Sequence, residues 1–94
     1  MEEITFEDFK NRIQKFQGKD LYLMPKTMIT ATIIIEKCKM LINNYIIIFT
    51  DGKELDIEID VEPISKIEVS EYGNTFKLKF DIEENAVLDF DLNS

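Results

Sequence analysis

Five carboxylates spaced two residues apart form the pattern in this 94-residue sequence that most directly suggests chemistry. They lie in a stretch that alternates strictly between acidic and apolar residues, and we call them the acidic row: Glu54, Asp56, Glu58, Asp60 and Glu62. On a β-strand, successive side chains point to opposite faces, so these carboxylates would share one face at intervals of ~6.7 Å. Such a row could bind a metal ion, perform acid–base catalysis or bind a basic surface.

Catalysis and metal binding do not fit the residues available. The sequence contains no His, which is the commonest general base and a frequent zinc ligand. Calcium requires about six to eight oxygens around one point, whereas carboxylates on a straight strand diverge. The three glycines, Gly18, Gly52 and Gly73, are too far apart for a phosphate-binding loop. We therefore expect no enzymatic activity, no metal site and no cofactor.

The distribution of charge favours a basic protein as the partner. Residues 1–47 carry seven basic and six acidic side chains (+7 − 6 = +1), and residues 48–94 carry four and thirteen (+4 − 13 = −9), which together give −8. Nucleic acids and anionic membranes repel such a protein, so we expect direct binding to neither. Our first hypothesis is a non-enzymatic binding module of phage or mobile-element type. In this hypothesis the acidic row engages a basic partner, as an inhibitor or as a decoy that imitates nucleic acid.

Two other interpretations of the acidic row stay open at this point. Alternating acids are common on the solvated face of a strand, where they keep a protein soluble and discourage pairing between sheet edges. A small homo-oligomeric structural or scaffolding protein, assembled through sheet edges or an apolar helix, is the alternative from a different class. Lys77 and Lys79 could pair across the sheet with Glu68, Asp89 or Asp91, and in a sequential meander they lie two strands away from the row, which stays unneutralised.

Length and composition indicate one folded domain over residues 1–94. Hydrophobic residues make up 45% of the chain and charged residues 32%, which is ordinary for a folded protein. Cys38 is the only cysteine, so an internal disulfide is excluded and a reducing compartment is expected. No segment reaches the ~18 apolar residues of a membrane span. The acidic start, Met1-Glu2-Glu3, is unlike a signal peptide. These features predict a cytoplasmic protein.

One amphipathic helix is predicted over residues 5–17. Thr5 is a good N-cap, two acids follow in the first turn, and Gly18 ends the segment. The apolar residues recur at helical spacing on one side: Phe6, Phe9, Ile13 and Phe16. This apolar side must cover another part of the protein.

The remainder of the chain is rich in Ile, Thr and aromatic residues and predicts strands. Pro25 suggests that the first of them is an edge strand or an extended entry into the sheet. A Thr- and Ile-rich run predicts one long, bent or bulged strand. Asn43-Asn44 and Asp51-Gly52 predict tight hairpin turns. The fold class expected is α+β and mostly β, with the helix packed on a curved antiparallel meander sheet or small barrel of about six strands. The predicted strands cover residues 20–24, 28–42, 45–50, 54–62, 64–72, 75–82 and 86–92.

Overall fold

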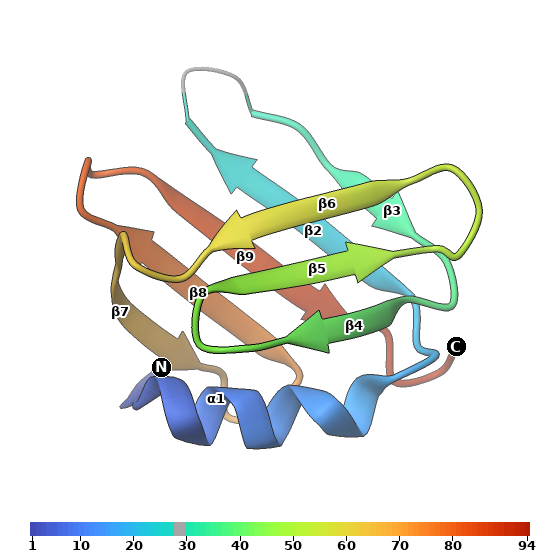
Figure 1. Cartoon of the computed structure of the whole chain (residues 1–94). Helices are drawn as coiled ribbons and strands as arrows, with labels where there is room; N and C mark the ends of the chain where they lie inside the picture. Colours follow the sequence, from blue (N-terminus) through green and yellow to red (C-terminus); the bar gives the residue numbers. More distant parts are fainter. Residues whose placement is uncertain (28–29) are drawn as a thin grey trace.

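The computed structural model describes residues 1–27 and 30–94 and shows a mostly β protein with one α-helix (Figure 1). In that part of the chain, nine strands form two antiparallel sheets. The elements are β1 (Glu2–Ile4), α1 (Phe6–Ile13), a 3-10 turn (Gln14–Phe16), β2 (Leu21–Lys26), β3 (Ile33–Ile35), β4 (Lys39–Ile42), β5 (Ile46–Thr50), β6 (Asp56–Asp60), β7 (Ile64–Val69), β8 (Thr75–Phe80) and β9 (Asn85–Phe90).

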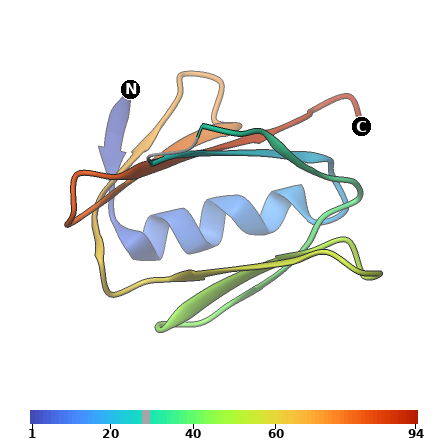
Figure 2. The same cartoon turned by 90° about the horizontal axis from the view of Figure 1, so that it is seen from above.

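The strands are ordered β1-β7-β8-β9-β2-β3 in the larger sheet and β4-β5-β6 in the smaller one. Seen from above, the two sheets face each other (Figure 2), and α1 runs along one open side of the gap between them, below β4 and β7 in Figure 1. The predicted class of a mostly β α+β fold is confirmed. The small-barrel form of that prediction is wrong because the described strands form two separate sheets, and no ladder among them joins the two sheets into a barrel.

The apolar side of the helix lies inside the core, as its spacing predicted. Phe9 and Ile13 are fully buried, and the Phe9 ring packs edge-on against Phe76 of β8, with 5.2 Å between ring centroids. Phe16 stacks on Phe90 of β9 at 4.7 Å. The helix begins as expected, because the Thr5 hydroxyl accepts a hydrogen bond of 3.1 Å from the backbone N–H of Asp8. None of the helical segments described is long and apolar enough to cross a bilayer.

The prediction of one long strand over residues 28–42 is wrong in its described part. β3 and β4 belong to different sheets, and the chain turns between them at Lys37, whose φ is +48°. The Asp20 carboxylate accepts a hydrogen bond of 2.9 Å from the Lys37 N–H and holds this turn. The turn lies at Glu36-Lys37, and neither residue is a Gly, Pro, Asn or Asp that would mark a turn in the sequence. Met28 and Ile29 lie outside the described residues.

The prediction of an edge strand over residues 20–24 is also wrong. β2 continues through Pro25 to Lys26 and lies between β9 and β3, with Pro25 opposite Ala86 of β9. The expected single meander is therefore interrupted, since β2 pairs with the last strand of the chain. β1 was not predicted, because three residues are too few to show a period; its Ile4 lies opposite Ile67 of β7.

Candidate protein-binding face

The acidic row lies on an exposed strand, as the alternation predicted. Its three central carboxylates, those of Asp56, Glu58 and Asp60, belong to β6, and all three side chains are exposed. Glu54 lies in the loop before β6 and Glu62 in the turn after it, and both are exposed. The apolar residues between them are half-buried and pack against the core: Leu55, Ile57, Ile59 and Val61.

The loop that leads into β6 is organised by Asp51. Its carboxylate accepts hydrogen bonds from the backbone N–H groups of Lys53 (2.8 Å) and Leu55 (3.1 Å). The bond from Lys53 is the main reason that the pKa of Asp51 lies below its ordinary value. Gly52 adopts a φ of +75°, as its place in the turn requires. The tight turn predicted at Asp51-Gly52, of two or three residues, is wrong, because the loop closes further along, with a bond from the Asp51 N–H to the Leu55 carbonyl (3.2 Å).

This loop sets which side chains border the acids. Across the sheet, Ile48 of β5 lies opposite Glu58 of β6 and Ile46 opposite Asp60. On the other side of β5, Leu41 of β4 lies opposite Ile48. We call this side of the sheet β4-β5-β6 the acidic face; it contains Lys39, Leu41, Ile46, Ile48, Thr50, Asp56, Glu58 and Asp60. Ile side chains of the central strand β5 therefore border two of the carboxylates.

Large apolar groups are exposed on the acidic face and next to it. The side chain of Leu41, on the face, is 66% exposed, and that of Tyr45, in the turn between β4 and β5, is 79% exposed. The helix does not cover Leu41, because it lies on the opposite side of the sheet, where Ile47 and Phe49 are fully buried. Sequence reasoning missed Leu41 and Tyr45 as site residues; the only available signal was the apolar composition of the two strands on both faces.

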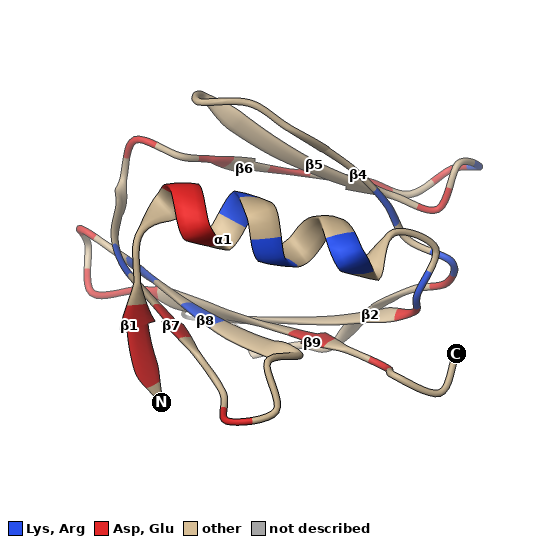
Figure 3. Cartoon of the chain, turned by 90° about the horizontal axis from the view of Figure 1, so that it is seen from below, with Lys and Arg blue, Asp and Glu red and all other residues tan. Residues whose placement is uncertain are grey.

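No carboxylate of the acidic row forms an ion pair with any described residue. The ion pairs in that part of the chain involve other acids: Glu7–Lys10 (3.1 Å), Asp8–Arg12 (3.1 Å) and Glu3–Lys66 (4.0 Å). Lys77 and Lys79 lie on β8 in the other sheet, opposite Glu68 and Lys66 respectively. Figure 3 shows this separation, with acidic positions along β6 and basic positions on β8. No ion pair with a described residue therefore neutralises the row.

The segment after the helix closes the outer edge of β4. The side-chain amide of Gln17 donates a hydrogen bond of 3.0 Å to the Met40 carbonyl, and its oxygen accepts one of 3.0 Å from the Met40 N–H. The Gly18 N–H donates to the Cys38 carbonyl (2.8 Å), and the Cys38 N–H donates to the Lys19 carbonyl (2.9 Å). These four bonds replace those that a neighbouring strand would make.

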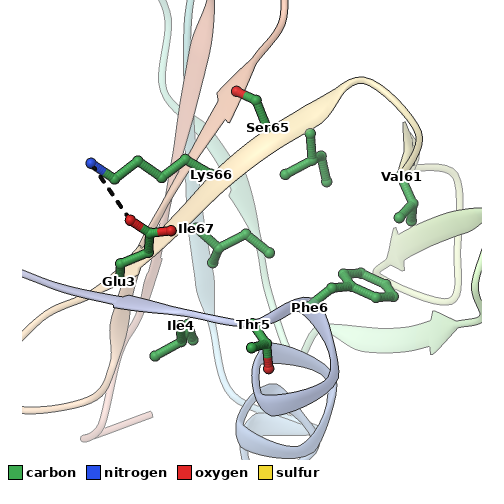
Figure 4. A pocket seen from close by; sticks show the side chains of 9 residues that line it. Glu3, Ile4, Thr5, Phe6, Val61, Ser65, Lys66 and Ile67 are labelled. Carbon is green, nitrogen blue, oxygen red and sulfur yellow. Dashed lines mark ion pairs between the residues drawn. The ribbon is translucent and has the colours of Figure 1, made fainter.

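A second surface feature lies away from the acidic face, beside the start of α1. A hollow of about 420 Å³ between β1, the start of α1 and β7 is lined by apolar and polar groups in similar measure, and the Glu3–Lys66 pair is among them (Figure 4). Its two hydroxyls serve the fold: Thr5 caps the helix, and Ser65 donates to the Lys79 carbonyl. Among residues 1–27 and 30–94, no three Cys, Asp or Glu side chains are gathered as ligands for one metal ion.

Comparisons with other proteins do not identify a family for this chain. No known protein family, no curated protein sequence and no solved structure gives a significant match. Its function must therefore be argued from its own surface. The acidic face is the surface whose composition is least explained by the fold, because its charges are unpaired and its apolar side chains are exposed.

Proposed function

We propose that this protein is a non-enzymatic binding module whose acidic face binds a basic surface on a partner protein. One observation carries the proposal: exposed carboxylates without ion pairs to described residues share a sheet face with the exposed Leu41, and the exposed Tyr45 lies in the turn at one end of the same sheet. Unpaired charge alone would serve solubility. Unpaired charge together with exposed apolar side chains provides both attraction at a distance and surface to bury on contact.

The two components of the face have different roles in binding. The acidic row, on a chain of net charge −8, attracts a positively charged partner and raises the association rate in a manner that salt weakens. Leu41 and Tyr45 supply apolar and aromatic contact area, and aromatic residues are frequent among the side chains that dominate binding energy. We therefore expect acid substitutions to slow association and substitutions of Leu41 or Tyr45 to speed dissociation.

A matched pair of variants tests the proposal. The first neutralises the face with Asp56→Asn, Glu58→Gln and Asp60→Asn; the second neutralises three exposed acids elsewhere, with Glu2→Gln, Glu71→Gln and Asp81→Asn. Both variants change the net charge by the same amount, from −8 to −8 + 3 = −5. Only the position of the lost charges differs between them.

The assay is affinity capture from the cells in which the protein occurs, followed by binding measurements on the purified partner. We expect a basic protein to be retained by the wild type and by the control variant, released by salt, and not retained by the face variant. Retention of that partner by the face variant at unchanged affinity would refute the proposal.

A nucleic-acid decoy is a more specific form of this function. In that case the partner is a nucleic-acid-binding protein, and the acidic row occupies the groove that normally holds phosphates. Nucleic acid and this protein would then compete for the partner. The constant with which this protein inhibits nucleic-acid binding would equal its own dissociation constant for the partner. Simultaneous binding of both would eliminate the decoy form and leave the binding module intact.

Self-association is the second candidate, and the exposure of Leu41 and Tyr45 is the observation that favours it. The route through the apolar helix lacks a free surface, because Phe9 and Ile13 are buried in the chain's own core. Sedimentation at two protein concentrations in high salt tests this candidate. Association that survives salt and is abolished by Leu41→Lys with Tyr45→Lys would support an oligomer, and a monomer at both concentrations would exclude it.

A further inference from the structure

β6 is an edge strand without a neighbour on its outer side in the part of the chain that the structure describes. It is the last strand of the order β4-β5-β6, and no described strand continues the sheet beyond it (Figure 1). The other three sheet edges differ. β1 and β3 contain only three residues each, and the segment after the helix closes β4. β6 has five residues, or ~17 Å of open edge.

Two hydrogen bonds show which backbone groups of β6 point outward. At its two ends, the Val61 N–H donates to the Tyr45 carbonyl (2.9 Å), and the Asp51 N–H donates to the Leu55 carbonyl (3.2 Å). In an antiparallel pair, alternate residues make the ladder bonds, so the odd-numbered residues from 55 to 61 bond to β5. The N–H and C=O groups of Asp56, Glu58 and Asp60 therefore point away from β5. No hydrogen bond from the described residues reaches them on that side.

We propose that an extended basic segment of the partner adds to β6 as an antiparallel strand. This inference rests on the proposed function and specifies how the basic partner is held. The backbone of the segment would pair with the outward N–H and C=O groups of Asp56, Glu58 and Asp60. The same residues place their exposed carboxylates on the acidic face, so lysine or arginine side chains opposite them would lie beside the negative charges.

The inner side of the added strand calls for apolar residues. Ile57 and Ile59 alternate with the acids, are half-buried and pack against the core. Side chains of the added strand on that side would extend this apolar layer. The segment recognised is therefore one that alternates basic and apolar residues over about five to seven positions, the length of the open edge.

Charge excludes the other occupants of an open edge. A second copy pairing through β6 in the antiparallel sense would place two acidic rows side by side, which is unfavourable. A neutral strand would gain no compensation for the carboxylates, and charged side chains on an edge are a common defence against such pairing. A basic segment alone turns this repulsion into attraction.

Three synthetic peptides test the inference: a seven-residue peptide that alternates lysine and valine, the same peptide N-methylated at its lysines, and the same peptide N-methylated at its valines. In an antiparallel pair, residues with side chains on the same face lie opposite each other. The lysine N–H groups would therefore bond to β6, and the valine N–H groups would point to solvent. All three peptides carry the same charge, so only the edge hydrogen bonds differ.

We expect the unmethylated and valine-methylated peptides to bind alike, and the lysine-methylated peptide to bind at least about tenfold more weakly, because several backbone bonds are lost. On binding, the amide protons of Asp56, Glu58 and Asp60 should gain protection from hydrogen exchange, whereas those of Ile57 and Ile59 should already be protected. Calorimetry and NMR measure the two effects.

The remaining outcomes separate failure of this inference from failure of the proposed function. All three peptides could bind the wild type equally and fail to bind the variant with Asp56→Asn, Glu58→Gln and Asp60→Asn. That result would overturn strand addition and leave the acidic face as a binding surface. Absence of binding by every peptide would also overturn strand addition, and the capture experiment would then decide on the acidic face. The free protein could also form a dimer that the unmethylated peptide dissociates. In that case a second copy of the chain occupies the open edge of β6, and the proposal is overturned.

Discussion

Replacing Gln17 should destabilise the smaller sheet although this side chain is exposed. Its amide makes two hydrogen bonds of 3.0 Å to the backbone of Met40 and so takes the place of a neighbouring strand at the edge of β4. Gln17→Ala removes both bonds and opens this edge to water. Gln17→Glu keeps the bond from the Met40 N–H but places a carboxylate oxygen against the Met40 carbonyl.

The size of the effect follows from the number and the exposure of these bonds. A protein hydrogen bond contributes about 1 kcal/mol net, so two contribute about 2 kcal/mol in a buried setting. Water can reach Gln17 and replace part of that contribution, so we expect Gln17→Ala to lower the free energy of unfolding by about 1–2 kcal/mol. For a urea dependence of about 1.5 kcal/mol per molar, the unfolding midpoint would fall by about 1 M.

Urea unfolding followed by circular dichroism measures this change, and Gln14→Ala is the control. Gln14 is exposed and accepts only a 3.3 Å bond from Gln17, so its loss should cost less than about 0.5 kcal/mol. At neutral pH, Gln17→Glu should be at least as unstable as Gln17→Ala. At a pH below the pKa of the introduced Glu carboxyl, the stability of the Gln17→Glu variant should approach that of the wild type, because the protonated acid can donate a hydrogen bond to the Met40 carbonyl. An unchanged midpoint for Gln17→Ala would refute the role assigned to this side chain.

Three further predictions concern the turn before β6, the cysteine and the aromatic core. The backbone N–H groups of Lys53 and other neighbours lower the pKa of Asp51 below its ordinary 3.8. The stabilisation by the ionised Asp51 carboxylate is therefore present above pH 3.8 and is lost as pH falls through the lowered pKa. In urea unfolding from pH 6 to pH 2, the advantage of the wild type over Asp51→Asn should therefore shrink as acid is added, and a constant difference would contradict this. Burial raises the pKa of Cys38 to about 11, so alkylation of the native protein at pH 8 should be negligible and should become complete in denaturant; rapid native labelling would show that the thiol is accessible. Phe76 packs edge-on against Phe9, and its ring centroid lies 6.3 Å from that of Phe90. Phe76→Ala should therefore lower the free energy of unfolding, measured by heat or urea, by about 3–5 kcal/mol. A decrease below about 1 kcal/mol would argue against a central place for Phe76 in the core.

The parts of the fold that were predictable are those with a local period. The helix over residues 5–17 and the alternating strand around Ile57 could be recognised because neighbours in sequence decide which side is buried. The split between β3 and β4 could not, because the Ile-rich run gives the same local signal whether it continues or turns. Its turn depends on Asp20, which is 17 positions from Lys37 in the sequence. The pairing of β2 with β9 is likewise set by contacts between distant segments.

The candidate face was predictable in its acids and not in its apolar neighbours. Alternation alone placed Asp56, Glu58 and Asp60 on one exposed side of a strand. The neighbours depend on register, and register depends on how each turn closes. Asn43 accepts bonds from the N–H groups of Tyr45 (2.7 Å) and Ile46 (2.9 Å), which moves the predicted turn by one position and leaves Tyr45 exposed at its tip.

The position of β9 has a consequence for biosynthesis. This strand lies between β8 and β2, so residues 85–90 complete the middle of the larger sheet, and Leu88 and Phe90 are fully buried there. Until the ribosome has released them, residues 21–26 lack a neighbour on that side. The hairpins of β4, β5 and β6 involve only nearby residues and can form earlier, on the nascent chain. The surface that we assign to binding would thus emerge before the sheet behind it is finished.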